Sequence, residues 1–579
     1  MIEIARNRRR PLPAVLPPIS AGRVEIEGRA KQIIETGRNR LVFGGVMFAL
    51  AFLTICLRLV DLSVFEAAPH ARQLARPLAT ERAAERADIV DRNGVVLATN
   101  LGVQSLYANP REVLDVDSAA KRLVAVLPEL NENEVKARLK LDKAFVWLRR
   151  KLTPRQQAAV IRQGIPGLYF RREETRVYPH GRLAAHVVGL AGDDNVGLTG
   201  IERSFDEVLR ESDEPLRLSL DVRVQQVVHE SLSRAAKTFR ATGGAAMVMA
   251  VDSGEIVAMV SLPDFDPNVF ENVDPEAQFN RGTLGVYEMG STFKLFTAAM
   301  ALESGKATLR SSYDARRPIK VARFLISDYH AKNRVLTVPE ILVYSSNIGA
   351  VRMALDVGTE GQRAFLEQLG MLQRSSLELP EIGDPLIPTP WREISTMTIA
   401  FGHGLSVSPV QLVSGISALV NGGIFYPATL LKRPSGTVPG RRVLSPTVSD
   451  QMRWLMRQVV VHGTGRKANS EMYPVGGKSG TAEKAGRGGY RKKSLLSSFV
   501  GAFPIDDPQY VVLVMLDDPQ PTKETYGYAT GGWVAAPTVK EIVERSGPLL
   551  GLPPVHVIDQ DRDGRIVEAS AQFGTFVKR

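Results

Sequence analysis

The chain has 579 residues, 44% of them apolar and 23% charged, with 73 Lys and Arg against 62 Asp and Glu for a net charge of +11. Such a composition is ordinary for a folded protein of two or three domains. It comes with no zinc-finger spacing and no aromatic-basic ribonucleoprotein motif, so we expect no nucleic-acid binding. Cys56 is the single cysteine, which excludes an intramolecular disulfide.

The N-terminal segments predict a membrane anchor. Residues 1–40 are rich in proline and arginine and form a basic arm, which we expect to be cytoplasmic and without structure of its own. The apolar run that follows is uncharged over 41–57 and continues past Arg58 to Val60, which predicts a transmembrane helix over 41–60, although a buried helix of a soluble domain is the alternative. Because the run begins so far from the N-terminus, we expect an uncleaved anchor. Arginines before it, and Asp61 and Glu66 after it, indicate that the rest of the chain is exported.

Residues 61–235 mix helix and strand signals and carry no complete catalytic pattern. Asp91-Arg92-Asn93-Gly94 predicts a hairpin turn between two short strands. Ser118-Ala119-Ala120-Lys121 has the Ser-x-x-Lys pattern of some acyl-transfer enzymes. We interpret it as part of an ordinary helix over 119–127, capped by Asp117 or Ser118.

Residues 236–548 have strands at both ends and helices between them. Apolar runs at 245–251 and 256–261 predict one hairpin, and those at 495–503 and 510–516 predict a second, with a further strand over 478–483. This order predicts one antiparallel sheet assembled from distant parts of the chain and packed by helices, which is an α+β fold. Residues 549–579 remain as a C-terminal tail.

Ser291 is the candidate nucleophile. It opens a buried-looking apolar helix directly after Gly290, and Lys294 lies three residues on, on the same helix face. A lysine in that position can take the serine proton, and the positive end of the helix favours developing negative charge. A plain helix N-cap is the alternative for Ser291.

Two further motifs follow Ser291 and not Ser118. They are Ser345-Ser346-Asn347, and Lys478-Ser479-Gly480-Thr481 behind a flexible glycine pair. Ser-x-x-Lys, Ser-x-Asn and Lys-Ser/Thr-Gly, in this order, are the three parts of the penicillin-recognising acyl-transfer site. The predicted sheet places the strand that bears Lys478 beside the helix that begins at Ser291.

With these motifs the chain resembles the class B penicillin-binding proteins, which are peptidoglycan D,D-transpeptidases with one membrane anchor. The resemblance implies a transpeptidase domain over 236–548 on a non-catalytic pedestal or dimerisation domain over 61–235. The basic arm, the pedestal size and one glycine-rich stretch are most similar to the septal, cell-division type. Other matching stretches are Arg86–Gly94, Arg176–Gly181, Gly197–Glu202, Asp266–Asn268, Asn280–Arg281, Gly402–Val407 and Gly531–Pro537.

The resemblance implies a role for each catalytic residue. Ser291 attacks the carbonyl of the penultimate D-alanine of a stem peptide, and Lys294 is its general base, with a pKa lowered by burial and by Lys478. Ser345 passes the proton to the leaving amine. Asn347 binds the substrate amide and holds Lys294 in place.

The third motif is implied to bind the substrate. Lys478 supplies positive charge, and the hydroxyls of Ser479 and Thr481, on either side of Gly480, bind the terminal carboxylate. Backbone N–H groups of Ser291 and Thr481 hold the oxyanion. An amine of a second stem peptide resolves the acyl-enzyme, and β-lactams stall at the acyl stage.

The resemblance also implies partners and a location. We expect peptidoglycan stem peptides and β-lactams as ligands, the bacterial inner membrane as the site, and divisome proteins including a glycosyltransferase as partners. The catalytic domain is expected in the periplasm. A lateral-wall transpeptidase, a catalytically minor division scaffold, and a hydrolase or carboxypeptidase are the alternatives.

We expect neither a cofactor nor a metal. The histidines lack metal-ligand spacing, and His403, between two glycines, is interpreted as structural. Asp559, Asp561 and Asp563 copy the start of a calcium loop, but Ser570 stands where the last acidic ligand is needed.

Overall fold

The computed structural model describes residues 43, 45–57, 86–192, 194–269, 273–321, 324–434, 440–486 and 489–554. The chain divides into two units, 1–83 and 84–579. In the first, residues 45–57 are helical and exposed. No helix among the described residues is both long and apolar enough to cross a membrane, so the span at 41–60 stays a prediction. The basic arm and the aspartates of the calcium-like loop lie outside the described residues.

The pedestal is built on a small sheet. β1 (Ile89–Val90) pairs antiparallel with β2 (Val96–Ala108) across the predicted turn. The Asp91 carboxylate fixes that turn by accepting hydrogen bonds from the N–H groups of Asn93 (2.7 Å) and Val95 (2.9 Å). The remaining strands are β3 (Val146–Leu152) and β4 (Leu168–Val177), both antiparallel to β2, and β5 (Leu216–Arg217), parallel to β1.

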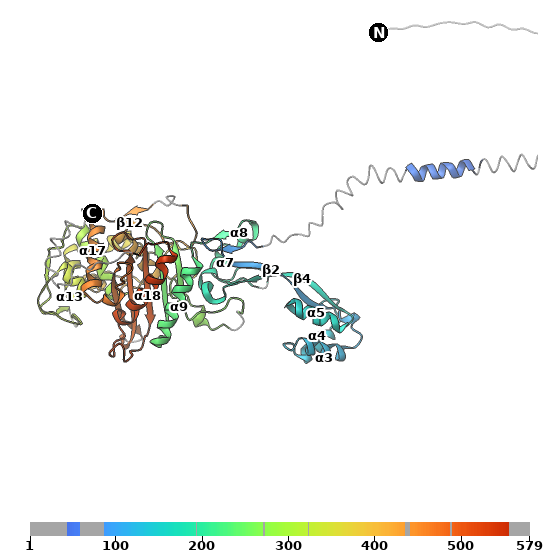
Figure 1. Cartoon of the computed structure of the whole chain (residues 1–579), viewed down its shortest axis with the longest axis horizontal. Coiled ribbons are helices and arrows are strands. Elements are labelled where there is room, and N and C mark those ends of the chain that lie inside the picture. Colours follow the sequence, from blue (N-terminus) through green and yellow to red (C-terminus); the bar gives the residue numbers. More distant parts are fainter. Residues whose placement is uncertain are drawn as a thin grey trace, which may run out of the picture. The chain divides into compact units, whose positions relative to one another are not determined.

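Three helices cover one face of β2, β3 and β4: α3 (Val116–Val126), α4 (Glu132–Leu139) and α5 (Pro154–Gln163). Figure 1 shows them together on one side of the strands. The cap of α3 is Asp115, whose carboxylate accepts a hydrogen bond from the Ser118 N–H at 3.0 Å. The predicted cap at Asp117 or Ser118 is therefore wrong, and Ser118 lies inside the first turn of the helix.

A buried ion cluster joins three distant stretches of the pedestal. The Glu202 carboxylate accepts from the guanidinium of Arg86 at 2.5 Å and from that of Arg176 at 2.7 Å. Arg86 also binds Asp206 at 2.7 Å. Glu202 belongs to α7 (Gly200–Ser204) and Asp206 to α8 (Asp206–Glu211); the other short helices of the pedestal are η2 (Pro110–Glu112), η3 (Gly181–Ala184) and α6 (Ala185–Val188). The charged residues of these stretches therefore pair with one another in the interior of the pedestal.

Residues 236–548, where the resemblance implies a transpeptidase domain, contain the predicted sheet. Its strands lie in the order β14-β15-β16-β6-β7 and are antiparallel throughout. The strands are β6 (Gly243–Ala250), β7 (Ile256–Leu262), β14 (Gly476–Gly486), β15 (Gly489–Phe503) and β16 (Tyr510–Asp517). Successive β6 side chains enter different cores, since Met247 and Met249 join one and Ala246 and Val248 the other.

Helices cover both faces of this sheet. α9 (Val222–Thr238) and α18 (Gly531–Leu549) pack against each other on one face, as Figure 1 shows. α11 (Lys294–Glu303) and α16 (Pro409–Val420) belong to the core on the other face. The α11 segment is buried on nearly all sides, as its apolar sequence predicts. The candidate nucleophile therefore stands at the start of a helix inside the domain.

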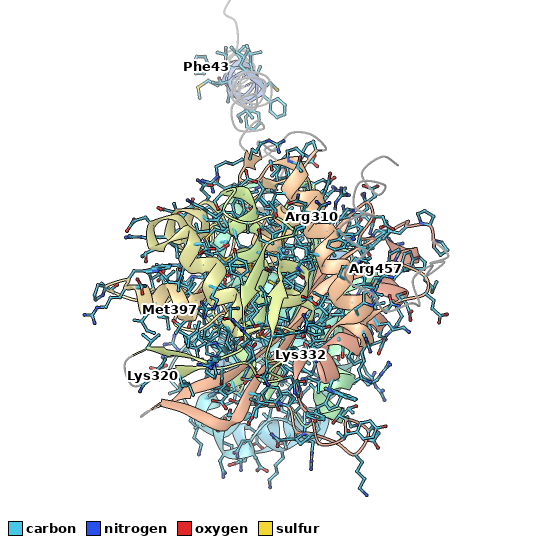
Figure 2. All side chains as sticks on the ribbon, turned by 90° about the vertical axis from the view of Figure 1, so that its left-hand side faces the viewer. Phe43, Arg310, Lys320, Lys332, Met397 and Arg457 are labelled. Carbon is cyan, nitrogen blue, oxygen red and sulfur yellow. The ribbon has the colours of Figure 1, made fainter. Side chains whose placement is uncertain are left out.

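The rest of the domain is mainly helical. In Figure 2, Met397 of α15 and Arg457 of α17 stand on opposite sides of the view. The helices are α10 (Pro275–Gln278), α12 (Val338–Val343), α13 (Asn347–Val357), α14 (Thr359–Gln368), α15 (Glu393–Ile399), α17 (Pro446–His462) and η5 (Arg466–Ala468). The antiparallel strand pairs are β8 (Ser312–Asp314) with β11 (Val335–Thr337), β9 (Ile319–Val321) with β10 (Phe324–Ile326), and β12 (Ile424–Phe425) with β13 (Arg441–Arg442).

Candidate active site

Ser291 lies in a tight turn directly before α11. The turn, η4 (Gly290–Phe293), is a 3-10 helix, so the α-helix proper begins at Lys294. Gly290 has a φ of +56° and donates its N–H to the carbonyl of Gly402 at 3.1 Å. Gly402 has a φ of +86°, and a Cβ added there would lie 2.0 Å from the Gly290 carbonyl oxygen. Two glycines are therefore needed to bring these backbones together around the nucleophile.

Lys294 is the centre of the site. Its side chain is wholly buried, and its Nζ lies 2.9 Å from Ser291 Oγ, 2.7 Å from the Ser345 carbonyl oxygen and 3.0 Å from Ser345 Oγ. Burial holds the pKa of Lys294 well below that of an exposed lysine, and the nearby charge of Lys478 lowers it further. A neutral amine at this distance can accept the proton of Ser291.

Ser345 connects the two lysines. Its Oγ accepts from Lys478 Nζ at 3.1 Å while it also contacts Lys294. Ser345 adopts a φ of +59°, an arrangement that costs a non-glycine residue about 1–3 kcal/mol. The next residue anchors it: Ser346 caps α13, accepts from the Gly349 N–H at 3.0 Å and donates to Asp328 at 2.6 Å.

Asn347 follows this group in the chain, and its side-chain hydrogen bond goes to a residue other than Lys294. Its amide donates to the Ser327 carbonyl at 2.9 Å, whereas the hydrogen bonds of Lys294 go to Ser291 and Ser345. The position of Lys294 is therefore fixed by Ser345, and the holding role expected of Asn347 falls to that serine. A substrate contact of Asn347 remains a prediction.

Lys478 extends from β14, the edge strand of the sheet. It is wholly buried and donates to Ser345 Oγ and to the Ser479 carbonyl, each at 3.1 Å. Burial lowers the pKa of Lys478 to about 7. A Cβ added to Gly480 would lie 2.7 Å from the Met289 carbonyl oxygen, so this glycine allows the strand to approach the nucleophile turn.

The two predicted substrate hydroxyls are each fixed by a neighbour. Ser479 Oγ donates to Thr464 Oγ1 at 2.8 Å, and Thr481 Oγ1 accepts from the Gly531 N–H at 3.1 Å. Thr464 is exposed and was missed by the sequence analysis, as was Asp328. The only sequence signal for Thr464 is its place between Gly463 and Gly465, directly after α17.

The backbones expected to supply the oxyanion donors are adjacent. The position of a Cβ on Gly290 is 3.3 Å from the backbone nitrogen of Thr481 and 2.7 Å from its carbonyl oxygen. The residue after Gly290 is Ser291. The predicted pair of N–H donors, from Ser291 and Thr481, therefore comes from two segments in van der Waals contact, although the donors themselves stay a prediction.

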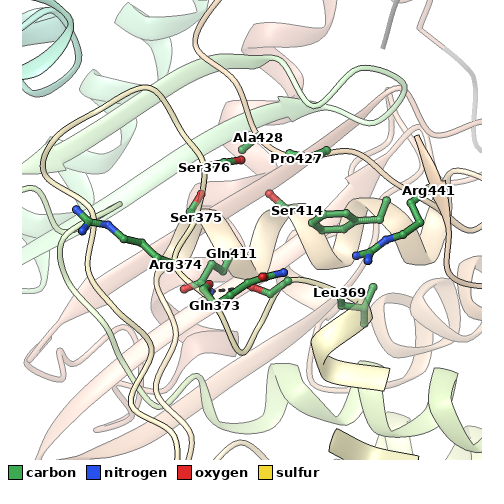
Figure 3. Close-up of a pocket in the computed structure, with 12 residues that line it drawn as sticks. Leu369, Gln373, Arg374, Ser375, Ser376, Gln411, Ser414, Pro427, Ala428 and Arg441 are labelled. Atoms are coloured by element: carbon green, nitrogen blue, oxygen red, sulfur yellow. Dashed lines mark hydrogen bonds between the residues drawn. The ribbon is translucent and has the colours of Figure 1, made fainter. Parts of the chain in front are cut away.

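Two other features of this domain are a cavity and His403. A cavity of about 330 Å³ is lined by Gln411 and Ser414 of α16 and by Arg441 of β13, and none of the predicted site residues lines it (Figure 3). His403 stands between Gly402 and Gly404, with its ring 5.2 Å from that of Phe401, and burial lowers its pKa. The structural role expected of His403 stays a prediction.

Comparisons with known proteins agree with this geometry. Residues 244–544 match the penicillin binding protein transpeptidase domain, and residues 81–236 match the penicillin-binding protein dimerisation domain. A probable peptidoglycan D,D-transpeptidase FtsI of Caulobacter vibrioides is 40% identical over 81% of this chain and 82% of its own length. The peptidoglycan D,D-transpeptidase FtsI of Escherichia coli is 28% identical over 87% and 90%.

A crystal structure of a peptidoglycan synthetase from Bifidobacterium adolescentis shares the fold. It has a TM-score of 0.63 and 24% identity, and the likeness covers 82% of this chain and 96% of that one. The order of the three motifs, their convergence on Ser291 and the two domain matches lead to one assignment. The chain belongs to the penicillin-binding protein family, with a transpeptidase domain and a dimerisation domain.

Proposed function

We propose that this protein is a serine-type peptidoglycan D,D-transpeptidase that cross-links stem peptides and is acylated by β-lactams. The observation that carries the proposal is the position of Lys294 Nζ, which lies 2.9 Å from Ser291 Oγ in a wholly buried site. The relatives from Caulobacter vibrioides and Escherichia coli bear the same activity in their names.

The reaction follows from the contacts. Ser291 Oγ attacks the carbonyl carbon of the penultimate D-alanine while Lys294 takes its proton. The developing oxyanion is held by the backbone N–H groups of Ser291 and Thr481, and such a donor is typically worth about 3–4 kcal/mol. The C–N bond to the last D-alanine then breaks, and the proton reaches the leaving amine through the Ser345 hydroxyl, which contacts Lys294. The amine of a second stem peptide attacks the ester, forms the cross-link and returns the proton to Ser291.

A fluorescent penicillin tests the nucleophile. We expect covalent labelling of the wild-type protein and none of Ser291→Ala. The chain provides its own control, since Ser118 has the same Ser-x-x-Lys pattern and lies half-buried on helix α3 of the pedestal. Ser118→Ala should label as the wild type does. Labelling that persists in Ser291→Ala contradicts the proposal.

The lifetime of the acyl-enzyme separates a transpeptidase from a hydrolase. A hydrolase must bring water to the ester, whereas a transpeptidase waits for an amine. We expect the penicilloyl adduct to persist for many minutes after free penicillin is removed. Rapid turnover assigns the protein to the hydrolases instead.

The cellular role that we propose is septal. The N-terminus is then in the cytoplasm, a single helix over 41–60 anchors the chain in the bacterial inner membrane, and the catalytic domain works in the periplasm with divisome proteins, including a glycosyltransferase. The charge asymmetry across this segment and the FtsI-type relatives support the proposal. The alternatives are the lateral wall and a catalytically minor scaffold.

Depletion of the protein from growing cells distinguishes these roles. Filaments support the septal role, and rounded cells indicate the lateral wall. If Ser291→Ala restores division to depleted cells, the protein is a scaffold whose catalysis is dispensable.

A further inference from the structure

Lys467 is a cation held in place by an aromatic ring beside the active site. It lies in the turn η5, and its Nζ sits 4.3 Å from the centre of the Trp533 ring. The side chain is exposed, and no carboxylate among the described residues comes within ion-pair distance of it. The ring of Trp533 stacks in turn on that of Tyr528, with 5.8 Å between centroids. The Lys467 ammonium is therefore positioned by Trp533 and has no carboxylate partner among the described residues.

Contacts along two segments connect Lys467 to the third motif. Thr464, three residues before Lys467, accepts the hydrogen bond of Ser479 Oγ at 2.8 Å. The start of α18 packs on the same loop, because a Cβ added to Gly532 would lie 2.5 Å from the Thr464 carbonyl oxygen. Trp533 follows Gly532 directly. Trp533, which contacts Lys467, and Thr464, which contacts Ser479, therefore lie on two segments that pack together. The same segment of α18 also binds Thr481, through the Gly531 N–H.

Lys478 is poorly suited to bind an external carboxylate. It is wholly buried, and its ammonium already donates to Ser345 and to the Ser479 carbonyl. Burial also lowers its pKa to about 7, so it holds its proton less firmly near neutral pH than an exposed lysine does. The carboxylate of a D-alanyl-D-alanine terminus is fully ionised there. It needs a cation that is exposed and charged at the same pH.

We propose that Lys467 binds the terminal carboxylate of the stem peptide, and the equivalent carboxylate of β-lactams, beside the hydroxyls of Thr464 and Ser479. The inference rests on the proposed function and names a binding residue for that same site. Trp533 restricts the lysine side chain before the substrate arrives, which reduces the entropy lost on binding.

Benzylpenicillin and its methyl ester test the proposal, because they differ in the charge of one carboxyl group. The full-length protein in detergent is mixed with each compound, and the second-order acylation rate is measured. We expect Lys467→Met to acylate with benzylpenicillin roughly ten- to a hundredfold more slowly than the wild type. The rate with the methyl ester should be unchanged, and Lys467→Arg should keep most of the wild-type preference for the charged compound.

Arg466→Ala is the matched control, because Arg466 is the exposed cation next in the chain and donates to the His462 carbonyl at 3.1 Å. It should behave as the wild type with both compounds. An equal fall for both compounds in Lys467→Met indicates a structural role and overturns the inference, as does no fall for either. If the wild-type protein is not acylated at all, the proposed function fails instead.

Discussion

Two buried lysines converge on one serine hydroxyl, and this arrangement determines their charge. Lys294 and Lys478 both contact Ser345 Oγ, at 3.0 and 3.1 Å. Two positive charges so close in a buried site disfavour each other, and burial disfavours both. Burial, and then the charge of Lys478, hold the pKa of Lys294 well below its usual value. Lys294 is therefore the lysine that we assign as the neutral base.

The buried ammonium of Lys478 should cost stability in a way that depends on pH. Its pKa is about 7 in the folded protein and 10.5 as a free side chain. Between these values the unfolded chain binds more protons, so the stability of the wild type rises with pH across this window. Lys478→Met removes the penalty. We expect it to raise the thermal midpoint by a few degrees at pH 6–7, with a gain that shrinks towards pH 10, and to lose penicillin labelling.

The control is Lys136→Met, at a partly exposed lysine of α4 that pairs with Asp117 and Glu132 near the surface. Exposed pairs contribute little, so this change should shift the midpoint by less than a degree or two at every pH. A Lys478→Met gain that is equal at pH 7 and pH 10 contradicts the assignment of a lowered pKa to this lysine.

At the scale of elements, close backbone contacts between loops position the nucleophile turn. Gly402 and Gly422 both have a φ of +86°, so a Cβ strains the backbone similarly at each. At Gly402 the Cβ also meets the Gly290 carbonyl at 2.0 Å, whereas nothing lies within 4 Å of a Cβ at Gly422. We expect Gly402→Ala to slow penicillin acylation by more than tenfold, because the turn with Ser291 must move.

Gly422→Ala is the control, because it introduces the same backbone strain as Gly402→Ala without a steric clash. It should acylate at the wild-type rate and lose only about 1 kcal/mol of stability. Circular dichroism shows whether each variant is folded. Equal acylation rates in folded Gly402→Ala and Gly422→Ala are incompatible with the positioning of Ser291 by this contact.

The sheet and the motif order were open to prediction because they are written in local patterns. The apolar runs of β6 and β16 indicate buried strands, and three short motifs identify the catalytic side chains. Contacts made by single polar residues across long separations leave no such pattern. Asp328 reaches Ser346 over 18 residues and Thr464 reaches Ser479 over 15, each through one hydrogen bond. The 3-10 turn at Ser291 packs against Gly402, which lies much farther away in the sequence than either of these partners.

At the scale of the whole molecule, polar contacts fasten the pedestal to the transpeptidase domain within the unit 84–579. The backbone N–H and carbonyl of Tyr178 both bind the side-chain amide of Asn268, at 2.9 Å each. The Gly200 N–H, at the start of α7, donates to the Glu381 carboxylate at 3.3 Å. Residues beside the buried ion cluster therefore make the link, so the cluster supports both the pedestal and its attachment.

Glu202→Gln tests how far this support extends. The change keeps the shape of the side chain but leaves Arg86 and Arg176 buried with no full charge at the centre of the cluster. Breaking a buried pair in this way typically costs about 3–5 kcal/mol. We expect a clearly lower thermal midpoint, whereas Glu132→Gln, at a partly exposed pair of α4, should change it much less. Ser291 and its partners lie in the other domain and contact none of these residues, so penicillin acylation at 25 °C should stay within about twofold of the wild type. Parallel losses of acylation and stability at that temperature contradict this separation and instead make the ion cluster part of the control of the active site.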